Sequence, residues 1–250
     1  MTSSENSNAK NILVVSDNFD LVKLMQETVD KYEYNDIYFD FRYSSVNKNP
    51  QALIALGMKQ INVKQEVEQI IQSYQLVISA HCKQIFPAKL VNDTTCINIH
   101  PGLNPFNRGL YPQVFSIVNG LPIGVTIHLM NEEIDSGDII ISEPVAIYDT
   151  DTSLDVYNRI QDLEKRLIAE HLQSLVRGNY QTQKMAEEGN YNSIDDFKGL
   201  CQLNLDHQGT LKEHINLLRA LTHGEFLNAY FFDKNGKKVY VRIILEPETA

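Results

Sequence analysis

The feature that most limits how this chain can fold is a series of short β-branched segments separated by stretches with helical spacing. The segments ILVVS, LVISA and CINIH, at residues 12–16, 76–80 and 96–100, are typical of buried strands, and IYFDF at 37–41 alternates like another strand. A helical pattern of apolar residues spans 21–29. Strands that alternate with helices predict an α/β fold: a Rossmann-like, open, mostly parallel sheet with helices on both faces.

The same pattern continues toward the middle of the chain. Helical spacing is found at residues 63–74 and, after a proline start, at 112–119. The segments GVTIHLM and DIIISEPVAI, at 124–130 and 138–147, are typical of strands. A long helix is predicted from Thr152 to about Arg177, with Thr152 and Asp155 as a capping pair and Gly178 as its stop.

The composition of the chain changes after Gly178. A polar, aperiodic stretch is followed by a helical pattern and then by a β-hairpin that turns at Asn235-Gly236. We therefore predict a polar, disordered tail at residues 1–10, an α/β domain at 11–180 and a smaller region with a helix and hairpin at 181–250. An exposed aromatic hairpin favours pairing with a second copy, which predicts a homodimer through the C-terminal region.

Charge and cysteine usage exclude several classes of function. The formal net charge is −10, from 22 basic and 32 acidic residues, which disfavours nucleic-acid partners. The three cysteines Cys82, Cys96 and Cys201 form no CxxC pair, so neither a disulfide framework nor a cysteine zinc site is indicated.

The first ten residues lack the apolar core of a signal peptide, and no apolar run is long enough for a membrane span. A cytoplasmic protein without a membrane or metal partner is expected.

Two polar side chains stand at the end of the strand predicted at 96–100. Asn98 and His100 are two residues apart, so strand alternation places both on the same side. The following Pro101-Gly102 pair ends the strand and allows a ligand to approach the backbone closely. In open α/β sheets, ligands bind outside the carboxyl ends of the strands. The pattern indicates a binding site here, although either side chain alone can be purely structural.

A carboxylate precedes a turn between two later predicted strands. Asp135 lies just before Ser136-Gly137 and could orient or polarise His100 if the two side chains meet. The alternative is a structural Asx turn.

Together these residues resemble a known enzyme family. Asn98-x-His100-Pro101 followed by Asp135-x-Gly137-Asp138 is similar to the N10-formyltetrahydrofolate-dependent formyltransferases. The longer strings SAHCKQIFP, INIHPGLNPFNRG and PQVFSIVNGLPIGVTIH resemble the branch that formylates dTDP-linked amino-dideoxy sugars for surface polysaccharides such as O-antigen. The resemblance covers most of residues 10–180. It implies that 11–180 is the catalytic domain and that Asn98, His100 and Asp135 are the catalytic residues.

The resemblance also implies binding residues. The folate co-substrate is expected along the 81–87 loop and the turn near Asp135, which gives as contacts Lys83, Gln84, Ile85, Phe86 and Asp138. Ile85 and Phe86 could wall the pterin, although ordinary packing is the alternative for Phe86. For the nucleotide sugar, the expected contacts are Ser16, Asp17, Asn18, Asn107, Arg108, Phe226 and Tyr230. Arg108 and Lys83 are candidates for the pyrophosphate, although each could equally be a solvated surface cation.

Several alternatives remain at this point. A nicotinamide oxidoreductase would share the sheet, but the turn after residues 12–16 lacks GxGxxG. A zinc hydrolase could use His81, His100, His128 and Asp135, but no HExxH or HxxEH spacing supports it. Within the family, the substrate is expected to be dTDP-4-amino-4,6-dideoxyglucose, with a 3-amino-3,6-dideoxyhexose, glycinamide ribonucleotide or methionyl-tRNA as alternatives. Leu110 stands where a bulky aromatic is expected, which leaves the shape of the sugar pocket open.

Overall fold

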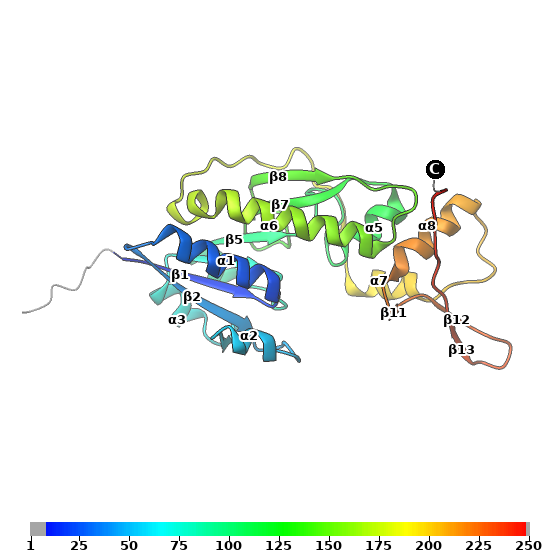
Figure 1. Ribbon diagram of the computed structural model, residues 1–250, viewed down its shortest axis with the longest axis horizontal. Helices are drawn as coiled ribbons and strands as arrows, with labels where there is room; N and C mark the ends of the chain where they lie inside the picture. Colours follow the sequence, from blue (N-terminus) through cyan, green and yellow to red (C-terminus); the bar gives the residue numbers. More distant parts are fainter. Residues whose placement is uncertain (1–8, 249–250) are drawn as a thin grey trace, which may run out of the picture. The chain divides into compact units, whose positions relative to one another are not determined.

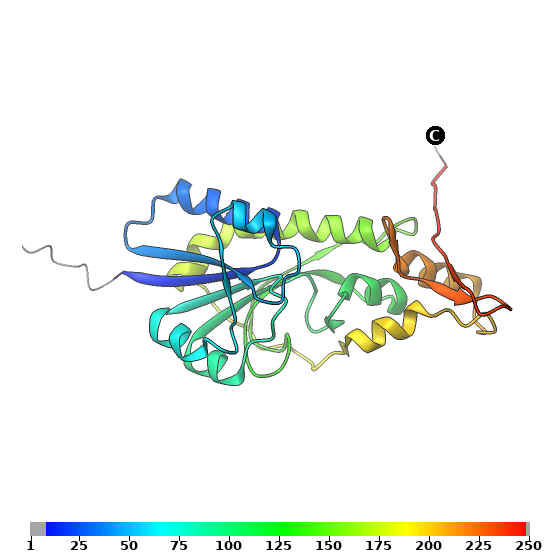
Figure 2. The same cartoon turned by 90° about the horizontal axis from the view of Figure 1, so that it is seen from below.

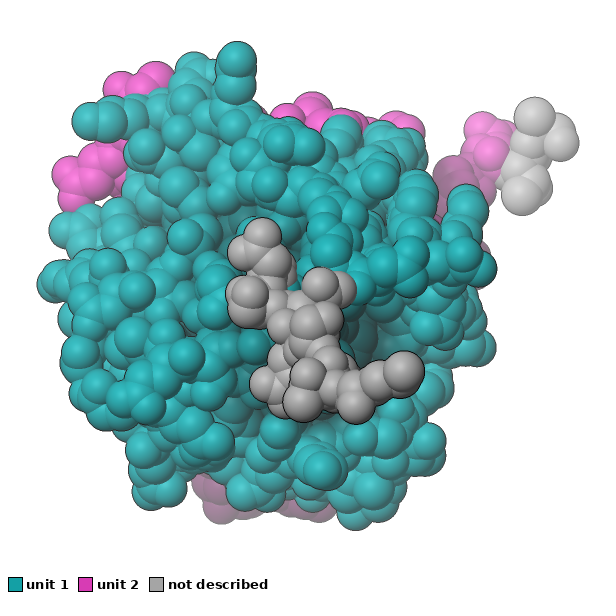
Figure 3. Space-filling view, turned by 90° about the vertical axis from the view of Figure 1, so that its left-hand side faces the viewer, with its two compact units in different colours: residues 1–100, 126–141, 164–185 teal, residues 101–125, 142–163, 186–250 magenta. Residues whose placement is uncertain are grey.

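The chain forms two compact units that are each assembled from separate stretches of sequence. The structure is a computed structural model and describes residues 9–248. Among the described residues, unit 1 consists of 9–100, 126–141 and 164–185, and unit 2 consists of 101–125, 142–163 and 186–248 (Figure 3). The boundaries 11–180 and 181–250 expected from the sequence remain a prediction about domains. Of the tail expected at 1–10, residues 1–8 lie outside the described residues, and Lys10 already belongs to a strand.

A seven-stranded sheet carries the order β3-β2-β1-β4-β5-β7-β8 (Figure 1). The first five strands along the chain run parallel to their neighbours, whereas β7 is antiparallel to β5. The predicted Rossmann-like, mostly parallel fold is confirmed. The strand bounds are β1 Lys10–Ser16, β2 Ile37–Ser44, β3 Lys59–Ile61, β4 Leu76–Ala80, β5 Thr95–His100, β7 Ile123–Leu129 and β8 Ile139–Val145.

Helices cover both faces of the parallel strands. Figures 1 and 2 show α1 on one face, and the cyan helices α3 and α4 on the other. Helix α1 begins after Asn18, whose side-chain oxygen accepts a hydrogen bond from Leu21 N. The helices that lie wholly in unit 1 are α1 Phe19–Tyr32, α2 Gln51–Ala55, α3 Val67–Ser73 and α4 Ala88–Asp93. The long helix α6, Ser153–Arg177, contributes its second half to unit 1.

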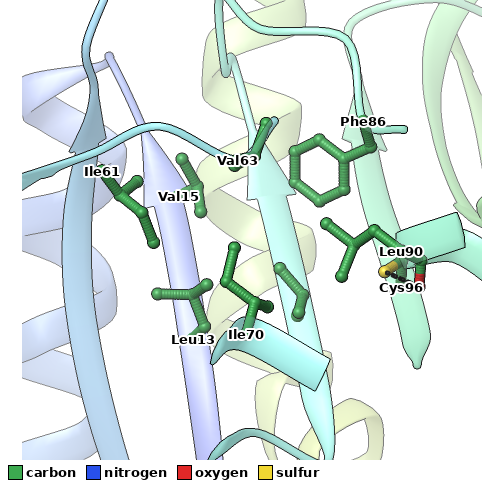
Figure 4. Close-up of a cluster of buried hydrophobic side chains, with 9 residues drawn as sticks. Leu13, Val15, Ile61, Val63, Ile70, Phe86, Leu90 and Cys96 are labelled. Carbon is green, nitrogen blue, oxygen red and sulfur yellow. Dashed lines mark hydrogen bonds between the residues drawn. The ribbon is translucent and has the colours of Figure 1, made fainter. Parts of the chain in front are cut away.

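A buried cluster fills the space between the sheet and the helices α3 and α4 (Figure 4). It joins strand residues that are fully buried to Phe86, which lies on the loop after β4. Because apolar area removed from water stabilises a fold by about 25 cal/mol per Å², this cluster fixes the position of that loop. Its members are Leu13, Val15, Ile61, Val63, Ile70, Val77, Phe86, Leu90 and Cys96.

Unit 2 combines short helices with two-stranded ladders. The predicted hairpin is confirmed: Tyr230 pairs with Tyr240, and Gly236 in the turn has a φ of 75°. The helices are α5 Pro112–Asn119, α7 Ile194–Cys201 and α8 Leu211–Leu221. The ladders are β6 Arg108–Gly109 with β9 Tyr191–Asn192, β10 Thr222–His223 with β11 Phe226–Leu227, and β12 Tyr230–Phe232 with β13 Lys238–Tyr240.

Some elements differ from the sequence-based expectation. The helix predicted from residue 63 begins at Val67, because Val63 is instead buried in the preceding turn and donates its N–H to Gln84 Oε1. Helix α7 lies in the stretch expected to be aperiodic, and it is started by a capping box of Ser193 and Asp196. In the part of the chain that the structure describes, we find no helix with the length and apolar character that a membrane crossing needs.

Candidate active site

The strands β4 and β5 end side by side and place polar groups at the same edge of the sheet. Parallel pairing aligns Ser79 with Asn98 and Ala80 with Ile99, so β5 reaches the edge at His100. His100 is buried and Asn98 is partly buried. The two side chains therefore stand where ligands of open α/β sheets bind.

Asp135 is brought to these two residues by the turn after β7. Its Oδ1 accepts a hydrogen bond from Asn98 Nδ2 at 3.1 Å, and its Oδ2 lies 3.5 Å from His100 Nδ1. Asp135 has a φ of 52°, a left-handed conformation that Asp tolerates better than most residues. The structure thus brings together the three side chains that the sequence singled out as catalytic.

Glycine is required two residues later in the same turn. A Cβ on Gly137 would lie 1.8 Å from the carbonyl oxygen of Leu129. This close approach seats the turn against the end of β7, where Leu129 N also donates to the carbonyl of Asp138 at 2.9 Å. The backbone of Asp138 is therefore structural, and its side chain is partly buried.

A second histidine, His128, completes the cluster and was not placed in this site from the sequence. It lies opposite Asn98 in the antiparallel pair of β5 and β7. Its Nε2 is 3.5 Å from Asp135 Oδ1 and 3.4 Å from Asn98 Nδ2, and its Nδ1 is 2.7 Å from the carbonyl of Leu129. An imidazole in a mostly apolar strand was the sequence signal that could have indicated a role for His128 in the site.

The electrostatics of the cluster fix how each group can act. Asp135 has a side chain only 10% exposed and faces one imidazole with each oxygen. A buried carboxylate is stable only when it has polar partners; Asn98 donates a hydrogen bond to Asp135 Oδ1, and His100 Nδ1 lies 3.5 Å from Oδ2. When His100 directs Nδ1–H toward Asp135, its Nε2 becomes the nitrogen that can exchange a proton with a ligand. The arrangement suits acyl chemistry with an amide donor and an imidazole.

Nucleophilic thiol chemistry and a metal centre find no support around this edge. Burial raises the pKa of Cys82 to about 12 and that of Cys96 to about 12, so both thiols stay protonated. Within residues 9–248, no group of three or more His, Cys, Asp and Glu side chains could hold a metal ion.

The 81–87 loop after β4 divides into buried and exposed residues. Phe86 belongs to the buried cluster (Figure 4), a position that favours packing over a pterin contact. Gln84 accepts from Val63 N at 3.0 Å and donates to Ser45 Oγ at 2.6 Å. Lys83 is exposed, and Ile85 is 62% exposed. Ile85 is thus the apolar side chain of this loop that a ligand can reach.

The residues after β1 are engaged in structural hydrogen bonds. The carboxylate of Asp17 accepts from Ser44 N and Oγ, and from Lys83 N at 2.9 Å. It therefore links the ends of two strands to the 81–87 loop. Ser16 is fully buried and its Oγ accepts from Asn18 N, while Asn18 caps α1.

Asn107 in unit 2 is the centre of an amide network. It is fully buried, and its Oδ1 accepts from the side chains of Asn119, Asn190 and Asn192. Its Nδ2 donates to Ser116 Oγ at 3.0 Å. This network holds the NPFNRG segment against residues 190–192, and Arg108 next to it is buried rather than solvated.

Phe226 and Tyr230, the two aromatic residues of the C-terminal region expected to contact the nucleotide sugar, differ in their surroundings. Phe226 is 67% exposed on β11. Tyr230 is partly buried on β12, and Lys238 Nζ lies 3.7 Å from its ring centroid. A cation already covers that face of Tyr230.

The comparisons with known proteins decide the family. Residues 1–172 match the family described as formyl transferase, and residues 196–247 match an N-formyltransferase dimerization C-terminal domain. The chain belongs to the formyltransferase family. The expected enzyme class, an N-formyltransferase, is thereby confirmed.

Full-length relatives of this formyltransferase include sugar-modifying enzymes. A sugar N-formyltransferase from a Shewanella species is 55% identical, with a TM-score of 0.93, and the match covers 96% of this chain and 99% of that one. A 4-N formyltransferase from Francisella tularensis is 43% identical, with a TM-score of 0.91, and the match covers 97% of this chain and 100% of that one. The dTDP-4-amino-4,6-dideoxyglucose formyltransferase of Mycobacterium bovis is 41% identical over 95% of this chain and 97% of its own length.

Proposed function

We propose that this formyltransferase moves a formyl group from N10-formyltetrahydrofolate to the amine of dTDP-4-amino-4,6-dideoxyglucose. The observation that carries the proposal is the convergence of Asn98, His100 and Asp135 at the strand end of a chain from this family. The choice of sugar is supported by the similarity to the Mycobacterium bovis enzyme and to the Francisella tularensis 4-N formyltransferase.

The proposed reaction begins with attack of the sugar amine on the formyl carbon. A C–N bond forms, and the formyl oxygen becomes an oxyanion. Asn98 Nδ2 donates one hydrogen to Asp135 Oδ1 and turns its other hydrogen toward that oxygen; Nδ2 itself lies 3.4 Å from His128 Nε2. The long contact to His128 is easily replaced, because catalytic hydrogen bonds often tighten only with substrate bound. His100 supplies a second donor through Nε2.

Collapse of the tetrahedral intermediate completes the transfer. The bond between the formyl carbon and folate N10 breaks, N10 takes up a proton, and the amine nitrogen releases one. Asp135 sets the charge of His100 and accepts the amine proton directly or through water. Because the attacking amine must be neutral, turnover decreases at low pH.

Binding roles are assigned in the same proposal. The folate lies along the 81–87 loop, where Lys83 and Ile85 are exposed. Within unit 2, Arg108 is the candidate for the pyrophosphate of the nucleotide sugar, and Phe226 offers an exposed ring for the thymine. The enzyme acts as a homodimer through the region that matches the dimerization domain, and its product is used in surface polysaccharide synthesis.

Three alternatives to this function can be distinguished by experiment. A 3-amino-3,6-dideoxyhexose differs in the position of the amine, and a substrate such as methionyl-tRNA is disfavoured by the net charge of −10. A catalytically silent binding protein would bind folate or dTDP without transfer.

The test is an assay with a panel of acceptors. The protein is incubated with N10-formyltetrahydrofolate and, separately, dTDP-4-amino-4,6-dideoxyglucose, a dTDP-3-amino-3,6-dideoxyhexose and glycinamide ribonucleotide, and products are identified by mass spectrometry. We expect formylation of the 4-amino sugar with the highest kcat/KM. Preferred formylation of another acceptor, or binding without transfer, would overturn the proposal.

A further inference from the structure

A buried histidine–glutamate pair lies outside the proposed catalytic cluster. His81 Nε2 is 2.9 Å from Oε1 and 3.0 Å from Oε2 of Glu164 on α6. Glu164 is fully buried, and the side chain of His81 is 16% exposed. A carboxylate at such a position is retained only with a close partner, and no step of the proposed reaction uses either residue.

The backbone at His81 shows what the pair holds in place. His81 is the residue that follows β4, and its φ of 56° is in the left-handed region, which non-glycine residues rarely adopt. Such a conformation persists only when the surroundings enforce it. The contact of Nε2 with both carboxylate oxygens of Glu164 is one interaction that holds His81 at the start of the 81–87 loop.

The rest of this loop is fixed by other contacts. Lys83 N donates to Asp17, Gln84 bonds to Val63 N and Ser45 Oγ, and Phe86 is buried in the cluster of Figure 4. Lys83 and Ile85 are the exposed side chains of this loop, and Ile85 is 62% exposed. A loop held along its length in this way is pre-organised for a ligand.

The pair also lies next to the proposed catalytic strand end. Ala80 is aligned with Ile99 in the parallel pair of β4 and β5, so His81 leaves the sheet beside His100. A change in the direction of the chain at His81 would move the folate-binding loop that starts there.

We propose that His81 and Glu164 are a positioning pair that holds the 81–87 loop in the conformation that receives the folate co-substrate. The inference rests on the proposed function, in which this loop binds the folate. The pair acts on the binding of the formyl donor and leaves the acceptor and the chemical step unchanged.

The test compares Glu164→Gln with Glu170→Gln, a matched change on the exposed face of the same helix. We expect Glu164→Gln to raise the KM for N10-formyltetrahydrofolate about tenfold, with kcat and the KM for the nucleotide sugar within about twofold of wild type. Glu170→Gln is expected to change none of these values. His81→Ala should reproduce the effect, and His81→Gln, which keeps a donor at the position of Nε2, should restore part of the affinity.

Two results would overturn the inference. One is a loss of stability in Glu164→Gln with all kinetic constants unchanged, which would make the pair purely structural. The other is an equal change in both KM values and kcat. Absence of formyl transfer by the wild-type protein would instead overturn the proposed function.

Hydrogen exchange on the wild-type protein keeps the inference testable if the variants do not fold. Saturating tetrahydrofolate should slow exchange of the amides at residues 82–86 about tenfold. Amides of α7 should serve as an unaffected reference. Unchanged exchange in the loop would overturn the inference.

Discussion

Asp135 is the residue on which the candidate site depends most, because its two oxygens face different partners. Oδ1 holds Asn98 and lies near His128, while Oδ2 faces His100. A neutral isostere would keep the shape of the turn and remove the charge that orients the rings.

Asp135→Asn is accordingly expected to lower kcat by about 10²–10³-fold, since proton transfer and the charge of His100 both depend on the carboxylate. The matched control is Glu133→Gln, an exposed carboxylate on the same segment, which should change kcat by less than about twofold. Steady-state kinetics and a melting curve for each variant make the comparison. Near-normal turnover in a folded Asp135→Asn protein would contradict the assigned role.

The His81–Glu164 pair makes a prediction about stability and pH. Burial lowers the pKa of His81, but the charge and hydrogen bonds of Glu164 raise the pKa by more, so the net shift is upward from 6.5. A raised folded-state pKa contributes stability that is fully present below the unfolded pKa and is lost as pH rises through the folded one.

Urea unfolding of the wild-type protein and of His81→Gln, at a series of pH values on both sides of 6.5, measures this contribution to the unfolding free energy. The difference in unfolding free energy should be largest below about pH 6.5 and should decrease as pH rises above it. A difference that stays constant, or that grows with pH, would show that His81 is not charged in the folded protein.

Individual residues also show where the sequence was sufficient for the site and where it was not. Asn98 and His100 could be placed because strand alternation and the Pro101-Gly102 end are local signals. His128 could not, since its contact with Asn98 depends on the register of β5 with β7. Phe86 has the same local pattern whether it lines a ligand site or packs in a core, and only its buried position in the fold distinguishes them.

At the scale of elements, the turn between β7 and β8 sets the position of Asp135. It is held against Leu129 because Gly137 has no side chain there. A methyl group on residue 137 would have to displace the backbone carbonyl of Leu129, which cannot move aside as a flexible side chain can.

Gly137→Ala should therefore reduce the unfolding free energy by about 3 kcal/mol and lower kcat with it. Gly199→Ala is the control, because a Cβ on Gly199 in α7 meets nothing within 4 Å. The unfolding free energy of the control variant should rise by about 1 kcal/mol, because alanine has a higher helix propensity than glycine. Denaturant unfolding of both variants measures the two values. A fully stable Gly137→Ala protein would mean that the turn can move.

The elements that the sequence revealed are those with strong local periodicity. Strands β4 and β5 and helix α5 lie within a residue of their expected bounds. The three-residue strand β3 is too short to show alternation and forms because it pairs with β2. Helix α7 was missed because its capping box stands in a polar stretch with few apolar positions.

At the scale of the whole molecule, the aromatic hairpin of unit 2 is the surface most suited to a second copy. Phe232 and Tyr240 on its two strands are 47% and 45% exposed, within the segment that matches a dimerization domain. Exposed aromatic groups of this kind are common at protein interfaces.

Replacing both Phe232 and Tyr240 with Glu should convert the proposed dimer to a monomer, because two buried charges cannot be paired at an apolar contact. Sedimentation velocity provides the measurement. Tyr38→Glu, on an aromatic side chain of β2 that is 62% exposed, should leave the dimer intact. A dimer that survives the double substitution would place the interface elsewhere.

The interleaving of the two units along the chain has a consequence for how this enzyme can be dissected. Each unit consists of three separate stretches of the chain, so a continuous fragment that contains all of unit 2 also contains residues 126–141 and 164–185 of unit 1. No single cut separates them. A fragment that ends at residue 185 keeps every stretch of unit 1, including Asn98, His100 and Asp135, but loses residues 186–250 of unit 2 and leaves the rest of unit 2 incomplete.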